Sequence, residues 1–318
     1  MVPSTNRPAL GRILVAFALV YVIWGSTYFA IRITLDSMTP SASAALRFMV
    51  AGPLLLALLR LSGQPVGIPG RELAQLAVIG ILLLVGGNAL VVWSEQYVAS
   101  GLAALMVATT PLWIAILGAA LPRGERLSPI GWAGVLLGLL GLGVLLWPKL
   151  SAGTGTEARG AAALVAATFS WAVGSLYAKR RTLTARPLVA TAWEMTFAGL
   201  ALFPVAVASG GFAHFAPGPA AWLALLYLVV CGSCVAFSAF VWLLHHVPAA
   251  KVMTYAYVNP VIAVLLGCAF RDEPLTTAML VGTPIIIAAV ALVTSAKVHS
   301  VATAPTVEAG RAPARDAA

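Results

Sequence analysis

Three charged residues lie inside long apolar stretches of this sequence, where a charge is costly. Arg47 lies about two helical turns inside the stretch 41–61, and Glu194 lies equally deep inside 187–208. Glu95 lies near the end of a third stretch. A charge at the centre of a membrane helix costs about 2.5–3.5 kcal/mol and is seldom kept without a role. Arg47 and Glu194 could each gate or anchor one face of a cavity, or their side chains could extend to the nearer membrane interface. Glu95 could exchange protons with a substrate, or it could be an interfacial carboxylate.

Hydroxyl, amide and aromatic groups recur inside the same stretches, at positions where a purely structural helix would hold leucine or alanine. Aromatic walls with a few convergent polar groups are the usual build of a small-ligand site. The alternatives are interface belts of Trp and Tyr, and helix-to-helix hydrogen bonds of Ser and Asn. For Asn88 and Trp171, which lie deep in their stretches, the cavity is favoured. The candidate set is Trp24, Ser26, Tyr28, Asn88, Trp171, Tyr177, Tyr255 and Asn259.

Two prolines lie 149 residues apart in matching surroundings. Pro111 follows a threonine and Pro260 follows an asparagine, and both lie inside apolar stretches. A proline inside a helix removes one backbone hydrogen bond and bends the helix. Pro111 and Pro260 are predicted to be mid-helix kinks with a gating role, although duplication alone would also copy them.

The sequence offers little for catalysis or metal binding. Cys231 and Cys234 have the spacing of a redox or metal pair, but no second pair or histidine set completes a site. A membrane-embedded enzyme would need a nucleophile with its base, paired carboxylates or a metal cluster. We predict no enzyme activity, no metal and no cofactor.

Composition identifies the setting of these residues. Of the 318 residues, 61% are hydrophobic and 9% charged, and the mean hydropathy is +0.97. Soluble domains average about 25% charged residues, so the chain is predicted to be an all-α integral membrane protein in a lipid bilayer. Stretches of about 20 apolar residues can span the membrane as helices. About ten such stretches are present: 12–34, 41–61, 72–95, 99–121, 128–147, 160–180, 187–208, 219–244, 249–270 and 276–295.

Lysine and arginine placement predicts the orientation. With the N-terminus in the cytoplasm, most basic residues fall on the cytoplasmic side, including Arg12, Arg60 and the run 179–181. Both termini are therefore predicted to be cytoplasmic, in the inner or plasma membrane. The net charge of +9 is explained as an orientation signal, and no nucleic-acid partner is expected.

The sequence also repeats itself. The segments 98–111 and 247–260 match, as do Gly25-Ser26 and Gly174-Ser175, at an offset of 149 residues. Each copy holds about five spans, and an odd number inverts the second copy in the membrane. Inverted repeats place a binding site near the midplane and permit alternating access. The predicted parts are a cytoplasmic tail 1–11, a first repeat 12–148, an external linker 149–159, a second repeat 160–296 and a disordered tail 297–318.

Several motifs together resemble a known family. They are the run from Trp24 through Gly-Ser-Thr-Tyr to Arg32, Ala45-Leu-Arg47-Phe, Ser100-Gly101 leading to Thr110-Pro111, and Glu125-x-Leu127, which returns as Glu273-Pro-Leu275. In this order they resemble the EamA family of the drug/metabolite transporter superfamily. The resemblance implies ten helices in two inverted halves and the carriage of small organic molecules.

We therefore expect a secondary transporter, and an exporter in particular, of small metabolites such as amino acids or of toxic compounds. The alternatives are a membrane-embedded enzyme and a non-transporting scaffold. Protons are a candidate coupling ion, through Glu194 or Glu95. Glycines at small-xxx-small spacing in the fifth stretch suit close packing within the bundle or at a dimer contact, so a monomer and a homodimer both remain open. These glycines are Gly134, Gly138, Gly141 and Gly143.

Overall fold

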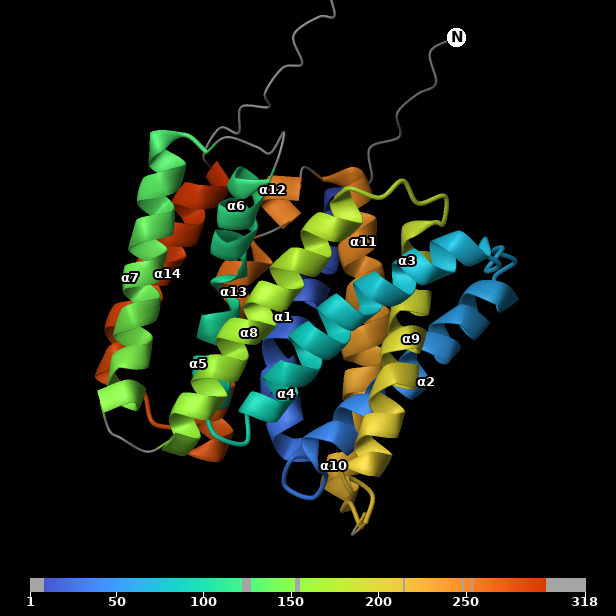
Figure 1. Cartoon of the computed structure of the whole chain (residues 1–318), viewed down its shortest axis with the longest axis horizontal. Coiled ribbons are helices and arrows are strands. Elements are labelled where there is room, and N and C mark those ends of the chain that lie inside the picture. Colours follow the sequence, from blue (N-terminus) through green and yellow to red (C-terminus); the bar gives the residue numbers. More distant parts are fainter. Residues whose placement is uncertain are drawn as a thin grey trace, which may run out of the picture.

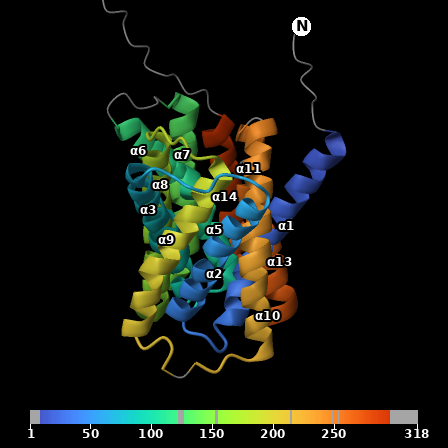
Figure 2. The same ribbon diagram turned by 90° about the vertical axis from the view of Figure 1, so that its right-hand side faces the viewer.

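The computed structural model shows an all-helical bundle in the residues that it describes (Figure 1, Figure 2). The described residues are 9–121, 127–151, 155–213, 215–247, 249–252 and 254–295. Within these ranges the helices run back and forth along one common direction, and no strand is present.

The helices of the first half follow the predicted stretches closely. They are α1 (Leu10–Thr34), α2 (Pro40–Leu61), α3 (Gly70–Gly80), η1 (Ile81–Ala89), α4 (Leu90–Ser94), α5 (Ser100–Val107), α6 (Thr110–Ala120) and α7 (Pro129–Ser151). The second half has the same order of parts. It comprises α8 (Gly155–Lys179), α9 (Pro187–Ala208), α10 (Pro219–Tyr227), η2 (Leu228–Val235), α11 (Ala236–His246), α12 (Ala249–Val252), α13 (Tyr255–Arg271) and α14 (Thr277–Ser295).

Nine helical runs in the described residues are long and apolar enough to cross a membrane. They correspond to nine of the ten predicted stretches. The remaining stretch, 249–270, is divided between α12 and α13, of which α13 is a shorter apolar helix. Residues 1–8 of the predicted N-terminal tail, the predicted tail 297–318 and the Glu125 position lie outside the described residues, and α1 begins at Leu10, inside the predicted tail 1–11.

The third helix of each half contains a π-helical segment. η1 lies between α3 and α4, and η2 lies between α10 and α11, so each run continues through the segment. Gly86 and Gly87 therefore lie inside the continuous helical run, in its π-helical part. A Cβ on Gly87 would lie 2.8 Å from the Trp171 ring, so the glycine permits close packing of η1 on α8. π segments occur frequently at functional sites.

One of the two prolines predicted to lie inside a helix is placed differently by the structure. The stretch 99–121 is interrupted by a turn at residues 108–109, and Pro111 lies in the first turn of α6. A proline is favoured there because its missing N–H needs no partner in a first helical turn. Pro111 thus begins a helix after a break, whereas Pro260 lies inside the continuous α13.

Close glycine contacts hold the longest helix pairs together. α2 packs on α9, where a Cβ on Gly52 would collide with the Thr196 backbone and one on Gly199 with the Met49 backbone. α7 packs on α14 in the same manner. Gly134 and Gly141 of α7 meet residues of α14, and Gly138 meets Leu112 of α6, so these three predicted glycines pack within the bundle. A Cβ placed on Gly143 would meet no atom of another residue within 4 Å.

The remaining contacts also cross between the halves. α1 packs on α10, η2, α11 and α13, and α8 packs on η1, α4, α5 and α6. The first helix of each half therefore contacts the third and fourth helices of the other. The space enclosed by these contacts contains the candidate site.

Candidate functional site

A cavity of about 910 Å³ lies between the two halves of the bundle. At one end it reaches the exposed side chains of Lys179 and Arg180, and at the other it stops at the buried Ile31, Val91 and Ala104. Its volume suits a small organic ligand. Ten residues predicted from the sequence line it: Trp24, Tyr28, Arg47, Asn88, Pro111, Trp171, Glu194, Tyr255, Asn259 and Pro260.

Arg47 is a buried charged residue of the cavity lining. Its side chain is 4% exposed, and the guanidinium lies 5.1 Å from the centre of the Phe48 ring. Its Nε donates to Ser233 Oγ at 3.0 Å, and Nη1 donates to Asn88 Oδ1 at 3.4 Å. Asn88 belongs to η1 and Ser233 to η2, so α2 presents the guanidinium between the two π segments.

An aromatic cluster forms the adjoining wall. The Trp24 ring lies 5.0 Å from Phe237, 5.1 Å from Phe240 and 5.1 Å from Tyr255, measured between ring centres. Trp24 Nε1 donates to the Gly232 carbonyl of η2 at 3.1 Å. Ring edges and faces at these separations attract one another and hold the wall in one arrangement.

The opposite wall has a related construction. Trp171 of α8 lies against Gly87 of η1, and the neighbouring Ser170 donates to the Leu82 carbonyl of η1 at 2.8 Å. Each π segment therefore offers a carbonyl to the first helix of the other half. A π segment leaves carbonyls without their usual helical partners, and these side chains satisfy one in each half.

Asn259 is buried beside the aromatic cluster. When the Asn259 amide is oriented with its nitrogen toward two backbone carbonyls, the nitrogen donates to the Tyr255 carbonyl at 3.1 Å and to the Tyr21 carbonyl at 3.3 Å. The side chain links α13 to α1 at the cavity wall.

Three predicted residues lie outside the cavity lining. Ser26 faces α10, where its hydroxyl lies 2.6 Å from the Tyr227 hydroxyl, whereas the adjacent Thr27 lines the cavity. Successive helical residues differ by about 100° in direction, which explains the difference. Tyr177 packs under the Arg181 guanidinium, 4.3 Å from its ring centre. Glu95, the third of these residues, is fully buried but is not part of the cavity lining.

A family model matches both halves of the chain. The EamA-like transporter family matches residues 11–147 and 158–295. The chain belongs to this family. It is a multi-pass transporter protein of the inner membrane.

Individual relatives agree with this assignment. The chain is 39% identical over 282 residues to the uncharacterized inner membrane transporter YedA of Escherichia coli strain K12, which covers 88% of this chain and 90% of YedA. It is 20% identical over 276 residues to the uncharacterized transporter YoaV of Bacillus subtilis strain 168, covering 85% and 92% of the two chains. A solved crystal structure, 23% identical, matches with a TM-score of 0.63 over 89% of this chain and 97% of that chain. This last likeness concerns the fold alone.

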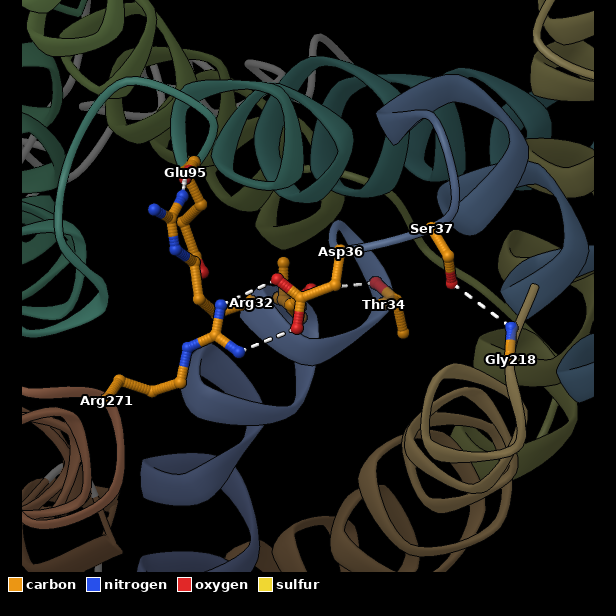
Figure 3. Close-up of polar contacts among 8 residues, drawn as sticks. Arg32, Thr34, Asp36, Ser37, Glu95, Gly218 and Arg271 are labelled. Carbon is orange, nitrogen blue, oxygen red and sulfur yellow. Dashed lines mark hydrogen bonds and ion pairs between the residues drawn. The ribbon is translucent and has the colours of Figure 1, made fainter. Parts of the chain in front are cut away.

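In this EamA-like transporter, Glu95 lies outside the cavity lining and beside Arg32 (Figure 3). It is 0% exposed, and neither carboxylate oxygen has a hydrogen-bond partner among the described residues. The Arg32 guanidinium donates to the backbone carbonyl of Glu95 instead. A buried carboxylate without partners is costly when ionised, so this environment favours the protonated form.

Polar links close the bundle at the same end. Arg271 donates to both Asp36 carboxylate oxygens, at 2.6 and 2.7 Å (Figure 3). This hydrogen bonding lowers the pKa of Asp36, so the link is complete above the usual aspartate range and is lost as pH falls through the lowered pKa. Glu273 accepts from Ser100 N at 3.0 Å, Ser100 Oγ at 2.9 Å and Gly101 N at 3.2 Å. We call these contacts of Asp36 and Glu273 the end closure.

Three residues of the cavity region and the end closure were not among the predicted site residues: Glu273, Ser233 and Phe237. The signal for Glu273 was present, because Glu125-x-Leu127 and Glu273-x-Leu275 are repeated motifs. Ser233 and Phe237 carry no such signal. In the described part of the chain, no group of three His, Cys, Asp or Glu residues could hold a metal ion, and Cys231, Cys234 and Cys268 are free thiols.

Proposed function

We propose that this protein moves a small organic solute across the inner membrane by alternating access between two inverted halves, and that it exports the solute. The cavity between the halves carries this proposal, because its described lining is exposed at Lys179 and Arg180 and buried at Ile31, Val91 and Ala104. A carrier in one access state requires a central site with one open and one closed end.

The contacts of α2 with α9 support the inversion of the halves 12–148 and 160–296. Gly52 meets Thr196, and Gly199 meets Met49, so the two helices cross antiparallel. Gly52 and Gly199 lie 147 residues apart, and so do Met49 and Thr196. Each contact is the counterpart of the other, as a two-fold axis in the membrane plane would produce.

Charge placement supports cytoplasmic termini and a cavity open to the cytoplasm. The open end of the cavity lies at Lys179 and Arg180, beside the basic run that ends α8. Positive residues accumulate on the cytoplasmic side of membrane proteins. The end closure then faces the outside. A site loaded from the cytoplasm suits export.

The proposed cycle uses these parts in order. A solute enters from the cytoplasm and binds between Arg47 and the aromatic cluster. The end closure then separates while the cytoplasmic ends of the halves approach one another, and the solute leaves outward. Helix pairs such as α2 and α9 join the two halves through backbone contacts, so we expect these pairs to stay packed while the ends of the halves separate and approach.

Transport itself is tested by flux in proteoliposomes. We expect the purified protein to release at least one labelled amino acid, organic acid or amine faster than protein-free vesicles do. Ala115 is a half-buried residue of the cavity lining, and Ala115→Trp should reduce that flux by about tenfold or more by filling the site. Transport is contradicted if no solute in the set moves, and the cavity assignment if Ala115→Trp transports normally.

We further propose Glu95 as the proton-coupling residue, ahead of Glu194. Glu95 is close enough to the cavity residue Tyr28 and to the end-closure residue Glu273 to interact electrostatically with both, and the Arg32 guanidinium donates to its backbone carbonyl. Opening the outer end would hydrate the Glu95 carboxylate and let it exchange protons with the outside. Movement of the halves and proton exchange are thereby linked.

Glu95→Gln mimics the protonated form and should make flux independent of a pH gradient. Exchange of labelled for unlabelled solute at equal pH should persist, since it needs no net proton movement. The measurement is efflux from proteoliposomes with and without a gradient, for the wild type, Glu95→Gln and Glu194→Gln. A gradient effect that survives in Glu95→Gln and disappears in Glu194→Gln would assign the coupling to Glu194.

A further inference from the structure

The guanidinium of Arg47 has no counter-charge among the described residues. No carboxylate of the described residues lies within 4.0 Å of it, and the Nη2 group makes no hydrogen bond there. Among the described residues, the Glu95 oxygens are the fully buried side-chain atoms that lack a partner. The Nη2 group is therefore accessible from the cavity that Arg47 lines.

Glu194 lies too far along the bundle to neutralise Arg47. In the antiparallel crossing of α2 and α9, Arg47 is level with Ala201, seven residues from Glu194. At 1.5 Å per residue this separation is about 10 Å along the helix axis. Glu194 instead lines the cavity on the side of Lys179 and Thr191.

We propose that Arg47 binds a carboxylate of the transported solute, and that the solute is a small organic acid with an apolar or aromatic body. The inference rests on the proposed transport function and names the solute class of the same site. A guanidinium presents a planar fork of donors that matches a carboxylate, and such pairs are stronger than neutral hydrogen bonds. An arriving anion would supply the counter-charge that the described residues of the protein lack.

The surroundings of Arg47 suit both ends of such a solute. Ser233 and Asn88 take up Nε and Nη1, which fixes the plane of the guanidinium and leaves Nη2 directed at the cavity. Ser233 adjoins Gly232, whose carbonyl holds Trp24 of the aromatic cluster. A carboxylate on Arg47 therefore places the attached body beside aromatic rings.

The test on the unaltered protein uses solutes that share a body and differ in head group. Phenylpropanoate, phenylpropanamide and phenylpropylamine form one set, and hexanoate, hexanamide and hexylamine form another. Binding is measured by tryptophan fluorescence and by the melting midpoint of the protein in lipid nanodiscs. We expect the carboxylate of each set to bind at least about tenfold more tightly than its amide and amine. Equal or tighter binding of an amide or amine would overturn the proposal, as would carboxylate dissociation constants all above about 10 mM.

Variants assign the preference to Arg47. Arg47→Gln should abolish the advantage of the carboxylate over the amide, and Arg47→Lys should reduce it while keeping its direction. Arg60→Gln is the matched control, because it makes the same change at an exposed position of α2. If Arg47→Gln fails to fold, the head-group order of the wild type and of Arg47→Lys still decides the question. A preference that survives in Arg47→Gln would overturn the assignment.

Flux separates this proposal from the transport function on which it rests. Vesicles that release amides or amines without favouring carboxylates would leave transport intact and remove the organic-acid proposal. Vesicles that release none of the six compounds and no solute of the wider set would remove both.

Discussion

Gly52→Leu and Gly199→Leu are each expected to prevent assembly of the bundle. A side chain at either position would overlap the backbone of the partner helix, at Thr196 or Met49, and backbone cannot rotate away as a side chain can. Overpacking in a well-packed core costs about 1–3 kcal/mol, and contact with backbone places these changes at or above the upper end. We expect little monodisperse protein by size-exclusion chromatography and a melting midpoint that is strongly lowered or absent.

Gly143→Leu is the matched control for this change. Gly143 also lies in a membrane-spanning helix, α7, but no atom lies within 4 Å of a Cβ placed there. It should purify and melt like the wild type. If Gly52→Leu behaved in the same way, the α2 and α9 contact described above would be wrong. If Gly52→Leu and Gly199→Leu lowered the melting midpoint by clearly different amounts, the result would count against the proposed two-fold relation of the halves.

The membrane class and most span positions follow from composition and hydropathy alone. These signals are strong because lipid tolerates few alternatives to a long apolar helix. The repeat provided a second kind of information, because it indicated two related halves of about five spans each. Deep residues such as Asn88 and Trp171 could also be placed at the cavity, since a polar or large aromatic group there needs a protein environment.

Other features depend on contacts that one sequence does not specify. The pair Gly86-Gly87 is compatible with a helix break, an α-helix or a π-helical segment. The structure has a π-helical segment there, and this segment packs against Trp171. Ser26 and Thr27 are similar in type, and only the rotation of α1 in the bundle decides which faces the cavity. The turn at 108–109 likewise places Pro111 at a helix start.

Glu273→Gln is expected to open the outer end of the protein. The Glu273 carboxylate accepts three hydrogen bonds from Ser100 and Gly101 at the start of α5, and an amide has one oxygen with which to replace it. Hydrogen bonds to charged groups contribute about 1.5–3 kcal/mol, so losing one shifts the balance toward the outward-open form by about tenfold or more. Unlike the more exposed Asp36 pair, these contacts involve the fully buried Ser100. Loss of Glu273 should therefore have the larger effect.

The opening can be measured with Ala104→Cys in a background without the native cysteines. Ala104 lines the closed end of the cavity and is 1% exposed, so an impermeant thiol reagent added outside intact cells should label it slowly. Glu273→Gln should raise the labelling rate by about tenfold, in line with the population shift. Asp272→Asn is the control, because it neutralises the adjacent exposed carboxylate while asparagine tolerates the left-handed backbone at φ 50°. Equal labelling in both variants would mean that Glu273 does not hold the outer end closed, and that closure depends on the packing of α5 against α13.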